Sequence, residues 1–348
     1  VPLPRKDKAT HGFEIFVEEG ELDPAPCSEF LLKRHDRPFL AVASFLSPHE
    51  VCEWSRRQPL PGGSIGEPPE VHARPPMRVN SEAPQCESDI MTHMRKSYQA
   101  HKLFPVGGYT DEDWRRLIWG YYRLIERADR FVGSVLSALR ESGQEENTVV
   151  IFVSDHGDCH GAHRWNQKTV FYDESARVPL IISQKGETQK GISDQLVNVG
   201  VDLLPTLCDL AGIDRPAGFP GMSLKDVALG NSPYLDRAYV VSQNHMIQCQ
   251  PVDGKHVTPH GRMVRSDRYK YCLYSEGELR ESLVDMYKDP GEMCNLAGQP
   301  ESAGILCRHR DYLRCFGQEH ADSQGLDMLA FVEQNHSDCI ITALDQDD

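Results

Sequence analysis

The chain has 348 residues, of which 39% are hydrophobic and 26% charged, a composition that excludes a wholly disordered protein and predicts a substantial core. Acidic residues outnumber basic ones by 52 to 37, so the net charge is −15, which argues against a nucleic-acid partner or an anionic membrane surface. The sequence contains no run of about 18 apolar residues, and it therefore predicts no integral membrane segment.

The N-terminal quarter is expected to be mostly irregular. Residues 1–37 mix charges, prolines and glycines, and predict an irregular segment. The apolar run from Pro38 to Phe45 predicts a buried strand that delivers His49 to the loop at its end. Residues 56–90 are rich in proline and glycine and predict another irregular stretch.

Helices and strands alternate in the middle of the chain. Apolar residues at helical spacing follow Thr110, which can cap the helix, and Gly143 is expected to end it. Thr148–Ser154 and Val178–Ser183 predict strands, and Val201–Leu210 predicts a second helix. This alternation predicts an α/β domain over residues 38–230, with a mostly parallel sheet flanked by helices.

A smaller C-terminal subdomain is expected after residue 230. Four short candidate strands are separated by turn residues: Ala238–Ser242, Arg262–Arg265, Arg268–Tyr274 and Ser282–Tyr287. Together with a helix near 300–316, they predict an antiparallel α+β subdomain over 235–316. Residues 317–348 are expected to form a weakly ordered acidic tail.

Polar residues follow the strongest strand candidate directly. Asp155 and His156 would lie at the carboxyl end of that strand, where α/β sheets bind ligands, and Gly157 lets the backbone turn tightly. A carboxylate and an imidazole there form half of a metal site, and Lys168 could contact an anion held beside it. The alternative is an ordinary strand-end turn in which these polar side chains only cap nearby backbone groups.

A three-histidine zinc site is a further alternative. His156, His160 and His163 have spacings that would share one face of a helix. Gly157 and Gly161 disfavour that helix, so this interpretation is the weaker one.

The stretch from Val153 to Ile182 resembles the type I sulfatases of the alkaline phosphatase superfamily. It contains Ser154-Asp-His-Gly-Asp158, Lys168 and Tyr172-Asp-Glu-Ser-Ala-Arg-Val-Pro-Leu180 in the family's order. Three more matches occur: Ser47–His49, Arg262–Tyr271, which resembles the family's Arg-Val-Arg…Lys-Tyr hairpin, and Leu283–Ala297 with its Asp-Pro-x-Glu. The resemblance covers roughly residues 38–300 and implies an alkaline-phosphatase-like fold.

The resemblance also implies roles for individual residues. Asp155 and His156 correspond to metal ligands of a divalent cation, usually Ca²⁺, with Mg²⁺ also possible. Lys168 corresponds to the lysine that binds the sulfate oxygens, and His49 to the histidine beside the leaving-group oxygen. These two are the catalytic candidates.

His163 corresponds to a histidine that many members have between the metal pair and the lysine, and Arg164 borders the expected pocket with Trp165. His163 and Arg164 are the candidates for substrate binding. The substrate implied is a sulfated small molecule or a sulfated carbohydrate. The sequence does not indicate an oligomeric state. A periplasmic or secreted location is expected if a signal preceded this start, and a cytoplasmic one otherwise.

The family's nucleophile motif is absent from the chain. Type I sulfatases carry Cys or Ser-x-Pro-x-Arg, whose first residue becomes formylglycine, but Cys52-Glu-Trp-Ser-Arg56 has Trp54 in the proline position. The chain therefore resembles a sulfatase that lacks the N-terminal part with its formylglycine, and we expect it to be inactive alone. Two other interpretations remain open: a phosphodiester or phosphonate-monoester hydrolase, and a non-catalytic remnant that binds sulfated glycans.

Overall fold

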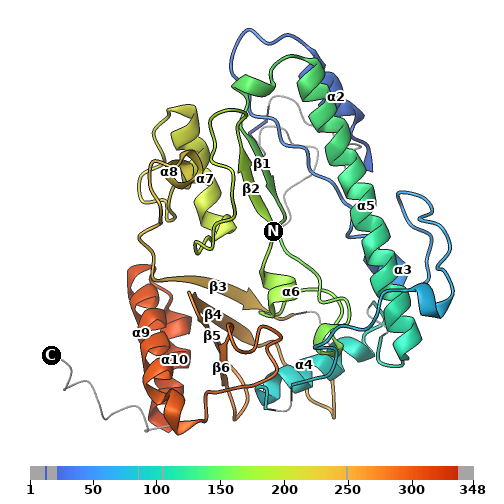
Figure 1. Ribbon diagram of the computed structural model, residues 1–348. Helices are drawn as coiled ribbons and strands as arrows, with labels where there is room; N and C mark the ends of the chain where they lie inside the picture. Colours follow the sequence, from blue (N-terminus) through green and yellow to red (C-terminus); the bar gives the residue numbers. More distant parts are fainter. Residues whose placement is uncertain (1–11, 14–21, 85, 104–105, 248–249, 336–348) are drawn as a thin grey trace. The chain divides into compact units, whose positions relative to one another are not determined.

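The computed structural model describes residues 12–13, 22–84, 86–103, 106–247 and 250–335 (Figure 1). The chain divides into two compact units, which are described separately. Unit 1 takes in residues 1–76, 109–150 and 183–187, and unit 2 takes in residues 77–108, 151–182 and 188–348. Among the described residues, no helix has both the length and the apolar character needed to cross a membrane.

Unit 1 is built around one long helix. Its elements are α2 (Ala25–Leu32), α3 (Val51–Ser55), η2 (Val71–Ala73), α5 (Asp111–Glu141) and η3 (Glu145–Asn147). Helix α5 begins with a capping box, in which the Thr110 hydroxyl accepts from the Asp113 backbone and the Asp113 carboxylate accepts from the Thr110 backbone. Helix α2 packs on α5, and Leu31 joins Ala138 and Leu139 in a small buried cluster (Figure 1). The expected long helix is confirmed.

Two expectations for the N-terminal region are wrong. Helix α2 lies inside the segment expected to be irregular, and Pro38–Phe45 forms no strand. Leu40 and Val42 in this run are 59% and 62% exposed. A strand needs a neighbour for its backbone N–H and C=O groups, and no described residue pairs with this run in a sheet.

Two of the strands predicted for the α/β region are present. β1 (Val150–Val153) and β2 (Leu180–Ser183) are hydrogen-bonded neighbours and form a two-stranded sheet within the described residues. The helical elements of unit 2 before its C-terminal sheet are α4 (Asp89–Ala100), η4 (Ala162–Arg164), α6 (Asp173–Ala176), α7 (Val199–Ala211) and α8 (Lys225–Leu229). The α/β fold class is therefore confirmed.

The C-terminal sheet of unit 2 has four antiparallel strands in chain order: β3 (Tyr239–His245), β4 (His260–Ser266), β5 (Tyr269–Tyr274) and β6 (Glu281–Asp285). One row of directly paired residues crosses the whole sheet and is buried: Val241, Val264, Tyr271 and Leu283. This row packs against α9 (Ala303–Glu319) and α10 (Ser323–Asn335), with η5 (Pro300–Ser302) before them (Figure 1). The antiparallel subdomain is confirmed.

The expectation of a weakly ordered tail is wrong for residues 317–335. Helix α9 continues to Glu319, and α10 buries Met328, Leu329 and Val332 against α9 and the sheet. These apolar residues recur at helical spacing, so the signal was in the sequence. Residues 336–348 lie outside the described residues.

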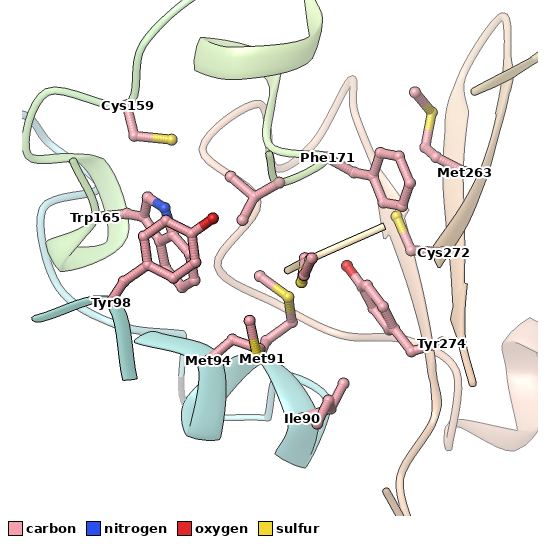
Figure 2. Packing of buried hydrophobic residues seen from close by; sticks show 12 residues of the cluster. Ile90, Met91, Met94, Tyr98, Cys159, Trp165, Phe171, Met263, Cys272 and Tyr274 are labelled. Carbon is pink, nitrogen blue, oxygen red and sulfur yellow. The ribbon is translucent and has the colours of Figure 1, made fainter. Parts of the chain in front are cut away.

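The opposite face of the C-terminal sheet covers a second core that is rich in sulfur. Met263 and Cys272, a directly paired couple of β4 and β5, meet Met91 and Met94 of α4 (Figure 2). Figure 2 shows Trp165, which belongs to the same cluster, beside the ring of Tyr98. The segment from residue 159 to 171 is therefore supported from below by α4 and the sheet.

Candidate functional site

The Asp155–His156 pair directly follows β1, as predicted. The Asp155 side chain is 84% exposed, and its Oδ2 lies 3.5 Å from Nε2 of His156. The pair is held by local bonds, since the His156 backbone donates to Asp155 Oδ1 and the Ser154 hydroxyl donates to the His156 carbonyl at 2.7 Å. A carboxylate and an imidazole thus sit together at the carboxyl end of a sheet strand.

Gly157 is required here because α6 approaches it very closely. Its N–H donates to the Ser175 carbonyl at 2.8 Å, and a Cβ at this position would lie 2.0 Å from the carbonyl oxygen of Glu174. The sequence predicted a tight turn, but Gly157 is not among the residues with positive φ. The constraint is therefore backbone contact with α6, which fixes where the preceding pair lies.

Lys168 and His156 act on the same buried carboxylate. Asp158 accepts from the His160 backbone at 2.8 Å, and burial raises the pKa of Asp158, while the charges of Lys168 and His156 act to lower that pKa. The half-buried Lys168 ammonium makes no hydrogen bond or ion pair with the described residues. An ammonium in this state can accept an anionic ligand without first losing a protein partner.

The loop that carries Lys168 holds unusual backbone conformations. Its non-glycine residues with positive φ are His160, His163, Arg164, Gln167 and Thr169. Such residues cost on the order of 1 kcal/mol or more each, and they cluster at functional sites. Backbone bonds from His163 and Arg164 to the carbonyls of Asn80 and Ser81 hold the loop, at 2.7 and 2.9 Å. The surrounding structure therefore stabilises a loop conformation that its own residues disfavour.

His163 is enclosed by protein. Its side chain is fully buried, its ring stacks on Tyr172 with centroids 3.7 Å apart, and Nε2 lies 3.2 Å from the Asn80 amide. Burial lowers its pKa to about 3, helped by the charges of Arg95 and Lys270. The imidazole is neutral, and direct contact of His163 with a substrate stays a prediction.

Arg164 lies beside His163 and is half-buried. Its guanidinium forms an ion pair with Glu82 at 2.5 Å, and Glu82 is mostly exposed. An exposed pair of this kind is worth at most about 1 kcal/mol, so a ligand anion could replace the carboxylate at small cost. Its predicted role in substrate binding stays a prediction.

His49 lies in unit 1, exposed, in the turn that precedes α3. The adjacent Glu50 is fully buried and accepts from Arg127 Nη1 at 2.7 Å, from the Gly62 backbone at 3.0 Å and from the Ser47 hydroxyl. Because the other candidates belong to unit 2, the convergence of His49 with Lys168 stays a prediction.

The sequence analysis missed the Glu50–Arg127 pair. Its signal was a charged residue, Arg127, on the apolar face of α5 that also carries Leu117 and Leu124. A charge on such a face needs a buried partner, because an unpaired one costs several kcal/mol. The sequence does not show which carboxylate pairs with Arg127, because the two partners are 77 residues apart.

The described residues do not form a complete metal site. Asp155 and His156 supply one carboxylate and one imidazole, and no group of three or more potential ligands occurs among the residues with described positions. Calcium takes about six to eight oxygen ligands, so the pair alone does not fit it. The three-histidine zinc site is likewise not formed in the described part of the chain.

The Asp-His pair after a sheet strand, the lysine loop and the antiparallel C-terminal subdomain agree with an alkaline-phosphatase-like fold. The family model described as Sulfatase matches residues 25–213, and the model described as N-sulphoglucosamine sulphohydrolase, C-terminal, matches residues 161–316. The chain belongs to the sulfatase family.

Similar proteins carry sulfatase names. The chain is 35% identical over 312 residues to a Delta 4,5-hexuronate-2-O-sulfatase of Bacteroides thetaiotaomicron, covering 86% of this chain and 60% of that protein. It is 31% identical to an ulvan-active sulfatase of Formosa agariphila, covering 77% and 45%. The solved structure of a 2-O GAG sulfatase superposes with a TM-score of 0.74 at 31% identity, covering 93% and 68%. The chain thus spans about half to two thirds of these relatives.

Proposed function

We propose that this chain is the part of a sulfatase that binds and polarises a sulfate monoester, R–OSO₃⁻, for hydrolysis to R–OH and hydrogen sulfate. The observation that carries the proposal is the Asp155–His156 turn, fixed against α6 and followed by Lys168, whose ammonium makes no hydrogen bond or ion pair within the described part of the chain. A sulfate ester has negative charge on its non-bridging oxygens, and such a cation stabilises that charge.

Each candidate residue has a separate task in this proposal. Lys168 donates to a non-bridging sulfate oxygen, and His49 gives a proton to the departing alcohol oxygen. Asp155 and His156 would supply one carboxylate and one imidazole to a divalent cation, calcium or otherwise magnesium, but they do not complete its ligand shell. Arg164 contacts a more distant part of the substrate.

We propose a sulfated carbohydrate as the substrate, with a 2-sulfated hexuronate as the first compound to test. The support is the name of the relative with 35% identity and that of the 2-O GAG sulfatase structure. Each of the two names states the activity of that relative. The half-buried Arg164 is suited to the carboxylate of a uronate, because a guanidinium binds a carboxylate with two parallel hydrogen bonds.

The test compares the 348-residue chain with a longer protein that carries an additional upstream segment. The chain alone lacks Cys or Ser-x-Pro-x-Arg, so we expect no measurable sulfate release, since loss of a covalent nucleophile costs several orders of magnitude. A version with an upstream segment bearing Cys-x-Pro-x-Arg, co-expressed with a formylglycine-generating enzyme, should release sulfate from a 2-sulfated uronate disaccharide.

Two variants of that longer version make the test specific. Lys168→Ala should lower kcat/KM by roughly a hundredfold or more, as loss of a charge-stabilising donor does. Lys185→Ala is the control, because Lys185 is an exposed lysine paired with Glu145. Sulfate release by Lys168→Ala at the control rate, or faster turnover of an aryl phosphonate ester than of any sulfate ester, would contradict the proposal.

A further inference from the structure

Two C-terminal motifs that the sequence analysis singled out have no task in the proposed function. Lys270 belongs to the Arg262–Tyr271 segment, and Glu292 belongs to the Asp-Pro-x-Glu of Leu283–Ala297. Both side chains are buried, at 2% and 6% exposure. A buried charge is costly unless it is paired and hydrogen-bonded, so the surroundings of Lys270 are informative.

The Lys270 ammonium is fully used by three acceptors. It donates to the Phe171 carbonyl at 2.9 Å, to Glu292 Oε1 at 2.8 Å and to the Asp173 carboxylate. The other oxygen of Glu292 accepts from the backbone N–H of Asp173 at 2.6 Å. Burial lowers the pKa of Lys270, but Glu292 and Asp173 raise it more, so the ammonium stays charged. Three of these four bonds therefore hold residues 171–173 at the start of α6, and the fourth joins Lys270 to Glu292.

The held segment contacts Gly157, which directly follows the candidate metal pair. Helix α6 begins at Asp173, and its Glu174 and Ser175 carbonyls touch Gly157. Gly157 donates to the Ser175 carbonyl and lies against the Glu174 carbonyl. A shift of α6 must therefore either move the Gly157 turn with it or break this hydrogen bond. The contacts thus run from β5 through α6 to the turn after β1.

A second set of bonds ties the same segment to the Lys168 loop. The buried Asn80 amide donates to Glu174 Oε1 at 2.8 Å and to the Gly291 carbonyl at 3.3 Å, and it lies 3.2 Å from His163 Nε2. Gly291 directly precedes Glu292. The segment that supplies Glu292 is therefore tied to both α6 and the loop.

We infer that Lys270, with Glu292, is a positioning residue: it fixes α6 and, through α6, the placement of Asp155 and His156. This inference rests on the proposed function for its purpose, but the placement itself is a property of the chain that is measurable without activity. A positioning role explains why Lys270, a buried lysine on β5, lies far along the chain from Asp155 and His156. A simple structural ion pair is the competing explanation.

The same sheet provides a matched control. Arg310 and Glu281 form another buried pair, with Arg310 Nε 2.8 Å from Glu281 Oε1 and both residues at most 5% exposed. Glu281 also accepts from the Tyr271 hydroxyl. This pair lies in the C-terminal subdomain and, among the described residues, forms no hydrogen bond or ion pair with α6. Breaking it removes a buried ion pair without releasing α6.

The test uses hydrogen exchange in the full chain with Lys270→Met and Arg310→Met. The reporter is the Gly157 amide, and urea unfolding corrects each variant for its loss of global stability. We expect Lys270→Met to speed exchange of Gly157 and of residues 173–176 by about tenfold beyond the global change, because their anchor is gone. Arg310→Met should leave both within about twofold. Equal acceleration in both variants, or none in Lys270→Met, would overturn the inference.

Two further measurements keep the test decisive. If Lys270→Met does not fold, Glu292→Gln replaces it, since this isosteric change weakens the hold on Asp173 and should speed Gly157 exchange about threefold. In the active longer version, Lys270→Arg should recover more kcat than Lys270→Met. Altered exchange without any effect on sulfate release would uphold the positioning and contradict the proposed function.

Discussion

Two apolar stretches of similar composition have opposite fates in this molecule. Pro38–Phe45 forms no strand and is mostly exposed, whereas Tyr269–Tyr274 is a central strand with five buried residues. The difference is the presence of neighbours: β5 pairs with β4 and β6 on its two edges, while the first run pairs with no described residue in a sheet. Apolar sequence therefore gives a strand only where a partner satisfies the backbone.

A large loss of stability is expected on the paired side of this comparison. Leu283→Ala should lower the free energy of unfolding by about 3 kcal/mol, because a fully buried leucine in a packed core leaves a cavity. Leu40→Ala is the matched variant in the exposed run and should cost less than about 0.5 kcal/mol. Urea unfolding measures the free energy of unfolding of both variants. Equal losses would show that Leu40 is as well packed as Leu283.

Acid should affect the loop that carries His163 but not the exposed run Pro38–Phe45. The run Pro38–Phe45 has no titratable side chain, whereas the loop above the sulfur-rich core contains His163, whose pKa is lowered to about 3. The folded chain holds His163 neutral, so its contribution is complete above the unfolded pKa of about 6.5 and is lost as pH falls toward 3.

His163→Gln makes this titration measurable. The stability of the parent chain relative to the variant should fall by about 1.4 kcal/mol per pH unit between pH 6 and pH 4, since one proton binds only to the unfolded state. The measurement is urea unfolding at several pH values. A difference independent of pH would show that His163 is accessible to protons in the folded chain.

The comparison also explains what the sequence could predict. Helix α5 and the antiparallel sheet were predictable because their hydrogen bonds close within the helix or between strands near in sequence. The Asp155–His156 turn was predictable for the same local reason. Lys270 was not, because its partner Asp173 lies 97 residues away and only folding brings them together.

A helix needs no neighbouring strand, so a local change should have a local cost. Thr110→Ala removes the side chain that accepts from the Asp113 backbone, and it should cost about 1 kcal/mol. Thr110→Ser keeps the acceptor and should recover most of this loss. Urea unfolding checks both, and an unchanged midpoint in Thr110→Ala would mean that the cap contributes nothing to α5.

The smallest effect is expected at Val42, where the substitution is nevertheless drastic. Val42→Asp should change the free energy of unfolding by less than about 0.5 kcal/mol, because a side chain that is 62% exposed loses little buried area and the new carboxylate stays hydrated. Val264→Asp makes the same change in the fully buried row of the C-terminal sheet and should prevent cooperative unfolding altogether, since an unpaired carboxylate there is not tolerated. A loss of more than about 2 kcal/mol in Val42→Asp would show that this run is buried in solution, as only burial makes an aspartate so costly. The run would then have a pairing partner, and its exposure would no longer distinguish it from β5.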